Sequence, residues 1–227
     1  KSGQLAKIDE DACIGCGQCK EVCRFDAVIK SENIYMIDPL GCEGCKTCEI
    51  ACPANAISMS ENVCGKWYIS KTRCGTMVHA ALKPGSENSG KLVSLVRKKA
   101  REQAEKFGTG MIIVDGPPGI GCPVIASIGS ASLVMIVTEP TQSGLHDLKR
   151  VIGLAAHFKV PACACINKYD LNEDLSDLIE KFCNDNGVDV LGKIPYDLNV
   201  TKSMLKKKSI VEYSDGDSSG EIKNIWT

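Results

Sequence analysis

Eight cysteines near the beginning of the chain have the residue type and the spacing needed to bind metal. The 227 residues contain fourteen cysteines, and such abundance indicates either a secreted disulfide framework or metal ligation. Two runs share the spacing C-x2-C-x2-C-x3-C: Cys13, Cys16, Cys19 and Cys23, then Cys42, Cys45, Cys48 and Cys52. Three closely spaced thiolates can hold one face of an iron-sulfur cubane whose fourth ligand comes from elsewhere. The spacing therefore predicts two 4Fe-4S clusters.

The second run repeats the first after 29 residues, and the flanking residues repeat with it. Ile8-Asp9 aligns with Ile37-Asp38, and residues 26–28 align with residues 55–57, so a whole structural unit is duplicated. In this arrangement the last cysteine of each run serves the other cluster. We assign one cluster to Cys13, Cys16, Cys19 and Cys52, and the second to Cys42, Cys45, Cys48 and Cys23.

Residues 1 to about 60 resemble the two-cluster bacterial ferredoxins, down to the Cys52-Pro53 ending. Arg24 follows Cys23 where that family often has Pro, which affects local packing and the field near one cluster but not ligation. Structural zinc is the alternative, although zinc sites favour paired C-x2-C knuckles over triplets. A disulfide scaffold is disfavoured because the chain shows no secretory signal.

The elements after about residue 61 are expected to form a parallel α/β domain, because apolar strands alternate with amphipathic helices. Expected strands cover residues 67–71, 76–82, 111–114, 133–137, 162–166 and 190–194. Apolar residues at helical spacing predict helices over residues 92–107, 145–158, 175–182 and 199–208. Asn88 or Ser89 is expected to cap the first of them, and Leu175, Leu178, Ile179 and Phe182 to form the apolar face of the third. Residues 215–220 are expected to form turns.

Polar or special residues follow four of these strands. They occupy residues 115–119, 138–140, 167–170 and 195–197, where an open parallel sheet binds its ligands. The segments DGPPGIG, TEP, NKYDLN and IPYD resemble the MinD/ParA-type P-loop ATPases, over residues from about 108 to the end. Within that superfamily the chain is most similar to MinD-like proteins that carry an inserted ferredoxin module. The resemblance implies a P-loop NTPase-like parallel-sheet domain with a small α+β ferredoxin-like domain.

The resemblance also implies roles for particular residues. Asp115 resembles the Walker B aspartate, which holds Mg²⁺ indirectly and orients the attacking water, and Gly119 would be the switch glycine. Asn167 resembles the asparagine that reads the adenine edge, and Pro195 and Asp197 lie where the family contacts the base. These residues imply ATP and Mg²⁺ as ligands of the intact protein.

Lys168 and Asp170 leave the choice of nucleotide open. With Asn167 they form NKxD, which resembles the guanine-reading motif of GTPases, so that GTP stays an alternative to ATP.

A complete phosphate loop is missing from the sequence. Residues 85–92 (GSENSGKL) fit the Walker A pattern except for Leu92, which cannot ligate Mg²⁺. For this segment, a surface loop with a Ser-capped helix start is favoured over a phosphate site. In the family the phosphate loop precedes the ferredoxin insertion, so we expect it upstream of Lys1. The chain as given is then expected to hydrolyse ATP poorly, and an exposed sheet edge would favour pairing with another chain.

Two domains follow from these patterns, a ferredoxin-like domain over residues 1–60 and a MinD-like nucleotide-binding domain over residues 61–227. A formal net charge of −1 and a pI near 6.4 argue against nucleic acid as a partner. The longest apolar runs are too short to span a membrane, and a cytoplasmic location is expected. Cys163 and Cys165, two apart on an expected strand, are expected to be core residues.

Two functions are compatible with the sequence. The first is an ATP-dependent redox or metallocofactor maturation protein, in which the nucleotide changes the conformation or pairing of the α/β domain and so gates electron transfer. Its partners would be a redox protein or a metallocofactor client, and it would form a homodimer or a closely related heterodimer. The second is a plain ferredoxin-type electron carrier whose α/β domain serves only for docking.

Overall fold

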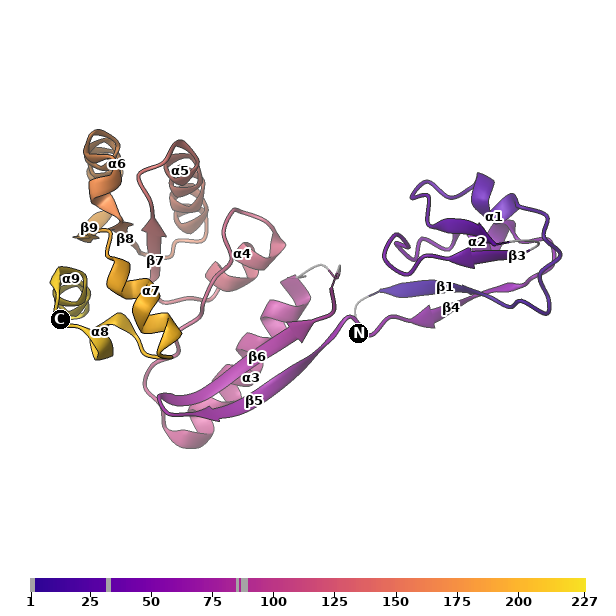
Figure 1. Ribbon diagram of the computed structural model, residues 1–227, viewed down its shortest axis with the longest axis horizontal. Coiled ribbons are helices and arrows are strands. Elements are labelled where there is room, and N and C mark those ends of the chain that lie inside the picture. Colours follow the sequence, from indigo (N-terminus) through magenta and orange to yellow (C-terminus); the bar gives the residue numbers. More distant parts are fainter. Residues whose placement is uncertain (1–2, 32–33, 85, 87–89) are drawn as a thin grey trace. The chain divides into compact units, whose positions relative to one another are not determined.

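Two compact units make up the protein. The computed structural model describes residues 3–31, 34–84, 86 and 90–227. The first unit comprises Lys1–Ser89 and Leu95–Ile112, and the second comprises Gly90–Ser94 and Ile113–Thr227 (Figure 1). Helix α3 (Gly90–Phe107) thus contributes residues to both units. The division into domains at residue 60 stays a prediction.

The first sixty residues form two interlocked β-α-β halves. The first half contains β1 (Gln4–Ile8), α1 (Gln18–Glu21) and β2 (Val28–Ser31), and the second contains β3 (Ile34–Ile37), α2 (Thr47–Ala51) and β4 (Ile57–Glu61). Strand β1 pairs antiparallel with β4, and β2 with β3, so each ladder joins the two halves. Equivalent hydrogen bonds repeat: Asp9 N donates to Ala56 O and Asp38 N to Ala27 O, both at 2.8 Å. The sequence duplication is therefore also a duplication of backbone contacts.

Left-handed backbone positions repeat between the halves as well. Residues with positive φ occur in three matching pairs: Gly15 with Gly44, Gly17 with Lys46, and Asp26 with Asn55. Two pairs lie between successive cysteines, where the chain must turn sharply, and the third pair follows the last cysteine of each run. The non-glycine members include Asn and Asp, which tolerate this region better than most residues.

A β-hairpin precedes the long helix α3. Strands β5 (Gly65–Thr72) and β6 (Gly75–Leu82) pair antiparallel, which confirms the strands predicted there. Helix α3 covers the predicted helical segment, and its Lys99 Nζ lies 5.8 Å from the centre of the Trp67 ring. The predicted caps Asn88 and Ser89, and half of the segment 85–92 that resembles a phosphate loop, lie outside the described residues.

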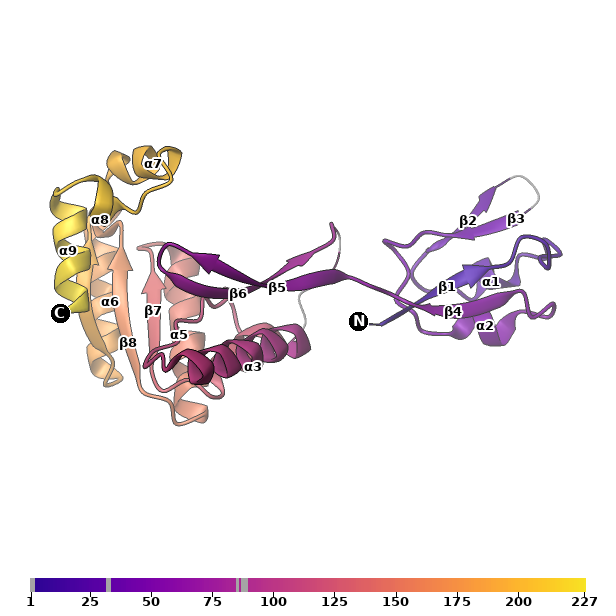
Figure 2. The same cartoon turned by 90° about the horizontal axis from the view of Figure 1, so that it is seen from below.

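The second unit contains a parallel sheet of order β7-β8-β9. Its strands are β7 (Val134–Thr138), β8 (Ala162–Asn167) and β9 (Asp189–Ile194). Helices α5 (Gln142–His157) and α6 (Glu173–Asp185) lie on one face, and α9 (Asp217–Trp226) lies on the other (Figures 1 and 2). Close packing of α9 on β9 leaves no room for a side chain at Gly192, where a Cβ would lie 2.6 Å from Ile225 Cγ1.

The core of this unit lies between the sheet and helices α5 and α6. Its least exposed side chains include Leu148, Ile166 and Ile179. Cys163 and Cys165 are also buried on β8, outside this cluster, which confirms the prediction that they are buried core residues. Leu178 was predicted on the apolar face of α6 but is 50% exposed, because the buried stripe continues from Ile179 to Cys183, four residues later.

Several predicted boundaries and elements are corrected by the structure. Residues 111–114 form no strand, and their apolar side chains are exposed. A strand requires a hydrogen-bonded partner strand. Among the described residues, β7 pairs only with β8, so residues 111–114 do not pair with the sheet. Helix α9 begins at Asp217, within the segment expected to form turns, because Ser218 and Ser219 are buried.

In the described part of the second unit, two short α-helices were not predicted: α4 (Cys122–Ile128), which has a proline in its first turn, and α8 (Ile210–Tyr213). The short helices α1 and α2 of the first unit were not predicted either. Helix α7 (Leu198–Leu205) lies within the segment predicted to be helical at 199–208, apart from its first residue. Across the described ranges, no helix is both long enough and apolar enough to cross a bilayer.

Candidate iron-sulfur centres and nucleotide-binding edge

Each run of cysteines surrounds a cavity together with one cysteine from the other run. The first cavity holds about 350 Å³ of empty space, its open mouth included, and the second about 310 Å³. The first is lined by Cys42, Cys45, Cys48 and Cys23. The second is lined by Cys13, Cys16, Cys19 and Cys52. The two halves of the duplicated module therefore share both cavities.

Two glycines lie at positions where the backbone comes close to other parts of the module beside these cavities. Gly44 has φ +63°, and a Cβ there would collide with the backbone carbonyl of Gln4. Gly17 has φ +82°, and a Cβ there would lie 2.8 Å from the Tyr35 hydroxyl. Gly44 lines the first cavity and Gly17 the second. Both glycines let a turning loop present its thiols inward.

The thiols of the two cavities differ in their surroundings. Cys45 Sγ lies 3.3 Å from the Thr47 hydroxyl oxygen, and this hydrogen bond lowers the pKa of the exposed Cys45 thiol. Burial raises the pKa of Cys19 in one cavity and of Cys48 in the other. Sequence reasoning did not single out Thr47, although its place two residues after a ligand candidate could have indicated a hydrogen bond to sulfur.

The donor set suits a cluster. Thiolates are the ligands of 4Fe-4S clusters, four to each cluster. A zinc ion would need its four sulfurs about 2.3 Å from one point. Among the described residues, no three His, Cys, Asp or Glu side chains are grouped to hold a single ion. The cysteines instead stand around cavities, and this arrangement fits a larger group.

A second site candidate lies at the carboxyl edge of the β7-β8-β9 sheet. In the parallel ladder of β8 and β9, Asn167 is paired with Ile194. The segments that follow these strands are therefore neighbours, and they bring together Asn167, Asp170, Pro195 and Asp197. The sequence predicted these four residues as nucleotide contacts, and that role stays a prediction.

Two side chains at this edge tie neighbouring loops to each other. Lys168 Nζ lies 2.7 Å from Glu139 Oε1, which joins the loop after β8 to the loop after β7. Asp170 Oδ1 accepts a hydrogen bond from Tyr196 N at 2.7 Å, which joins the loop after β8 to the loop after β9. The bond with Glu139 raises the pKa of Lys168. The TEP motif contains Glu139, but only the fold places it beside Lys168.

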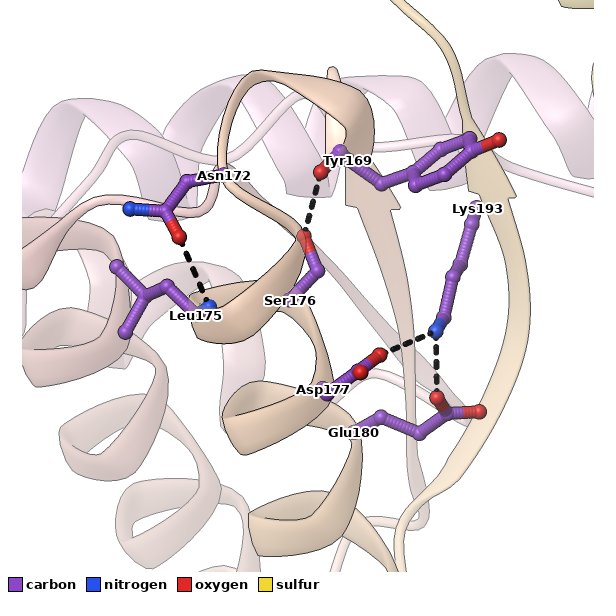
Figure 3. Close-up of polar contacts among 7 residues, drawn as sticks. All are labelled: Tyr169, Asn172, Leu175, Ser176, Asp177, Glu180 and Lys193. Atoms are coloured by element: carbon purple, nitrogen blue, oxygen red, sulfur yellow. Dashed lines mark hydrogen bonds and ion pairs between the residues drawn. The ribbon is translucent and has the colours of Figure 1, made fainter.

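The loop after β8 is held by the helix that follows it. The Ser176 hydroxyl donates to Tyr169 O at 2.8 Å, and Asn172 Oδ1 caps α6 by accepting from Leu175 N at 3.0 Å (Figure 3). Lys193 on β9 reaches back to α6, with its Nζ 2.6 Å from Glu180 Oε2 and 3.3 Å from Asp177 Oδ1 (Figure 3). These contacts fix β8, α6 and β9 as one block.

Asp115 and Gly119 lie in an irregular part of the second unit. Asp115 is exposed within residues 111–117, which have no regular secondary structure. Gly119 has φ +84°, a conformation that favours glycine. In the part of the chain that the structure describes, Asp115 makes no hydrogen bond or ion pair with the residues of the nucleotide edge. The Walker B role of Asp115 therefore stays a prediction.

Comparisons with known proteins define the class. Residues 6–59 match the family of the 4Fe-4S dicluster domain. The fold is similar to MinD in the MinC:MinD cell division protein complex of Aquifex aeolicus, with a TM-score of 0.53, 19% identity and coverage of 69% of this chain and 64% of that one. The protein therefore combines a 4Fe-4S dicluster domain with a MinD-like α/β fold. This confirms the predicted fold class.

One relative shows the family. The uncharacterized protein MJ0578 of Methanocaldococcus jannaschii is 32% identical over 227 residues, which cover 98% of this chain and 73% of the relative. The chain belongs to the same family as MJ0578. The iron-sulfur cluster carrier protein of Pyrococcus horikoshii is 29% identical over 140 residues, which cover 56% of this chain. The match spans 47% of the carrier, less than half its length.

Proposed function

We propose that the protein holds two 4Fe-4S clusters through the crossed ligand sets and relays electrons or clusters to a partner protein. The observation that carries this proposal is the composition of the two cavity walls, each with three cysteines of one run and the last cysteine of the other. Bound clusters would supply one-electron storage at two neighbouring points. The cysteines would hold the clusters, the burial of Cys19 would limit its contact with water, and the shared ligation would link the two halves.

The α/β unit is proposed to bind ATP with Mg²⁺ in the intact protein, through Asn167, Pro195 and Asp197 at the base and Asp115 near the phosphates. Support comes from the MinD-like fold and from the meeting of the β8 and β9 loops at one sheet edge. The phosphate loop would come from polypeptide outside residues 1–227. Nucleotide binding would then change the conformation or pairing of this unit and so control the dicluster domain.

The partner class is a redox protein or a metallocofactor client, in a cytoplasmic setting. Cluster delivery is supported by the similarity to a protein named as an iron-sulfur cluster carrier. A homodimer or a closely related heterodimer would bring two such units together.

A plain electron carrier with a docking α/β unit is the second candidate. The irregular, exposed segment around Asp115 favours it, because a Walker B aspartate ordinarily follows a buried strand.

One experiment separates these functions. The intact protein, reconstituted under anaerobic conditions, would be analysed for iron and then titrated with ATP while reduction of the clusters is followed by absorbance. About eight irons per chain are expected from two cubanes, together with an ATP-dependent change in the rate of reduction. Zinc, or about four irons, would refute the two-cluster assignment. Eight irons without ATP binding would support the plain electron carrier.

A further inference from the structure

The NKYD segment after β8 contains a carboxylate that is already engaged in the fold. Asp170 lies in a single 3-10 turn, Tyr169–Leu171. Its Oδ1 accepts from the backbone N–H of Tyr196 at 2.7 Å. A hydrogen bond to an ionised acceptor is among the stronger polar contacts in proteins. The carboxylate therefore points toward the loop after β9.

The backbone that carries Asp170 is fixed on both sides. Ser176 donates to the carbonyl of Tyr169 at 2.8 Å, one residue before Asp170, and Asn172 caps α6 two residues after it (Figure 3). Ser176 is fully buried, so few other hydrogen-bond acceptors are within reach of its hydroxyl. The backbone of Asp170 is consequently held in place, while its exposed side chain is held by the bond from Tyr196.

The loop after β9 is held at three successive residues. The Ser218 hydroxyl from α9 donates to Pro195 O at 3.2 Å, Tyr196 N donates to Asp170, and Asp197 Oδ1 caps α7 by accepting from Asn199 N at 2.7 Å. Ser218 is also fully buried. Of these three contacts, the one with Asp170 comes from the loop after β8. It therefore sets the distance between the loop after β8 and the loop after β9.

The other two polar residues of the segment, Lys168 and Asn167, differ in their contacts. Lys168 lies 2.7 Å from Glu139 and is thereby directed toward the loop after β7. The side chain of Asn167 makes no hydrogen bond with any described residue. Asn167 is thus the group left to meet a ligand at this edge.

We propose that Asp170 is a positioning residue that fixes the loop after β9 through Tyr196, and that the NKYD segment therefore does not read guanine. This inference rests on the proposed nucleotide function. Guanine offers N1–H and its amino group to a carboxylate and would need both oxygens of Asp170. Oδ1 already accepts from Tyr196 N; a carboxylate oxygen can accept a second hydrogen bond, but a guanine N–H would then have to share Oδ1 with Tyr196.

The test compares Asp170→Asn with Asp170→Ala. Asparagine keeps an oxygen that can accept from Tyr196, whereas alanine does not. In the 227-residue chain, the Tyr196 amide is expected to exchange with solvent faster in Asp170→Ala than in the wild type, and Asp170→Asn is expected to restore much of the protection. Unchanged exchange in Asp170→Ala would overturn the bracing role, whether or not the protein binds a nucleotide.

The second arm measures dissociation constants of ATP, GTP and xanthosine triphosphate in the intact protein. Asp170→Ala is expected to bind ATP about tenfold more weakly, equivalent to about 1.4 kcal/mol, and Asp170→Asn to bind it as the wild type does. Asp185→Ala, the same charge change at the far end of α6, is the control and should leave binding unchanged. Xanthine replaces the amino group of guanine with an oxygen, to which an asparagine amide can donate.

A guanine-reading Asp170 would show the opposite pattern. Asp170→Asn would then lose affinity for GTP and gain it for xanthosine triphosphate, and this result would overturn the proposal. If the wild-type intact protein binds none of the three nucleotides, the proposed nucleotide function fails, and the exchange measurement alone decides the role of Asp170.

Discussion

The sulfur of Cys52 accepts a hydrogen bond from the backbone N–H of Ala56 at 3.3 Å. Both residues line the second cavity, although Cys52 belongs to the second cysteine run. The same cavity is lined by Cys13, Cys16 and Cys19, so the last thiol of the second run lies among the thiols of the first. The crossed ligand sets are thus a specific geometric hypothesis with a direct test.

Removal of single ligands should reveal which cysteines share a cluster. Cys52→Ala is expected to alter the same electron paramagnetic resonance signal as Cys16→Ala, because both thiols line one cavity. Cys23→Ala should alter the same signal as Cys45→Ala. A Cys52→Ala spectrum that matches Cys45→Ala instead would show that each run ligates its cluster without exchange.

Gly44 should be essential to the first cavity. Its φ is +63° and a Cβ would collide with the backbone carbonyl of Gln4, so Gly44→Ala must displace the loop that carries Cys45. We expect loss of the cluster bound by Cys42, Cys45, Cys48 and Cys23, measured as iron per chain. Gly187→Ala is the matched control, since Gly187 has φ +67° with open space around it. It should cost about 1–2 kcal/mol of stability and leave the iron content unchanged.

Two neighbouring residues of α6 should differ widely in their effect on stability. Ile179 is fully buried, and Ile179→Ala is expected to lower the free energy of unfolding by about 2–5 kcal/mol through the lost contacts and the cavity left behind. Leu178 is half exposed, and Leu178→Ala should change it by no more than about 0.5 kcal/mol. Urea unfolding followed by circular dichroism measures both. Equal losses would contradict the observed orientation of α6.

Alkaline pH should remove a contribution to stability from Cys165. Burial raises the pKa of this thiol from 9.0 to about 11. The folded state therefore favours the uncharged thiol, and the contribution is complete below about pH 9 and lost as pH rises through about 11. The stability of the wild type relative to Cys165→Ala should shrink over this interval by on the order of 1–3 kcal/mol. The exposed Cys122, replaced by Ala, serves as the control. A pH-independent difference would argue against a buried, protonated Cys165.

The sequence by itself determined the dicluster module and the class of the second unit. Cysteine spacing depends on local backbone turns. The geometry around each ligand was therefore indicated by the regular runs, the 29-residue repeat and the glycines between the cysteines. The strands of the sheet were equally visible, because β7, β8 and β9 are short apolar runs closed by polar residues. Local pattern suffices where the interaction itself is local.

Only the tertiary structure decided which side chains at the sheet edge face each other. Lys168 meets Glu139, and Asp170 meets Tyr196, across 26 to 29 residues of sequence, because parallel strands align their carboxyl ends. The segment 111–114 has a strand's composition but no ladder partner among the described residues, whereas the polar start of α9 became helical by packing on β9. Strand pairing and side-chain burial depend on contacts between segments that are distant in the sequence. The sequence of one segment alone therefore does not determine them.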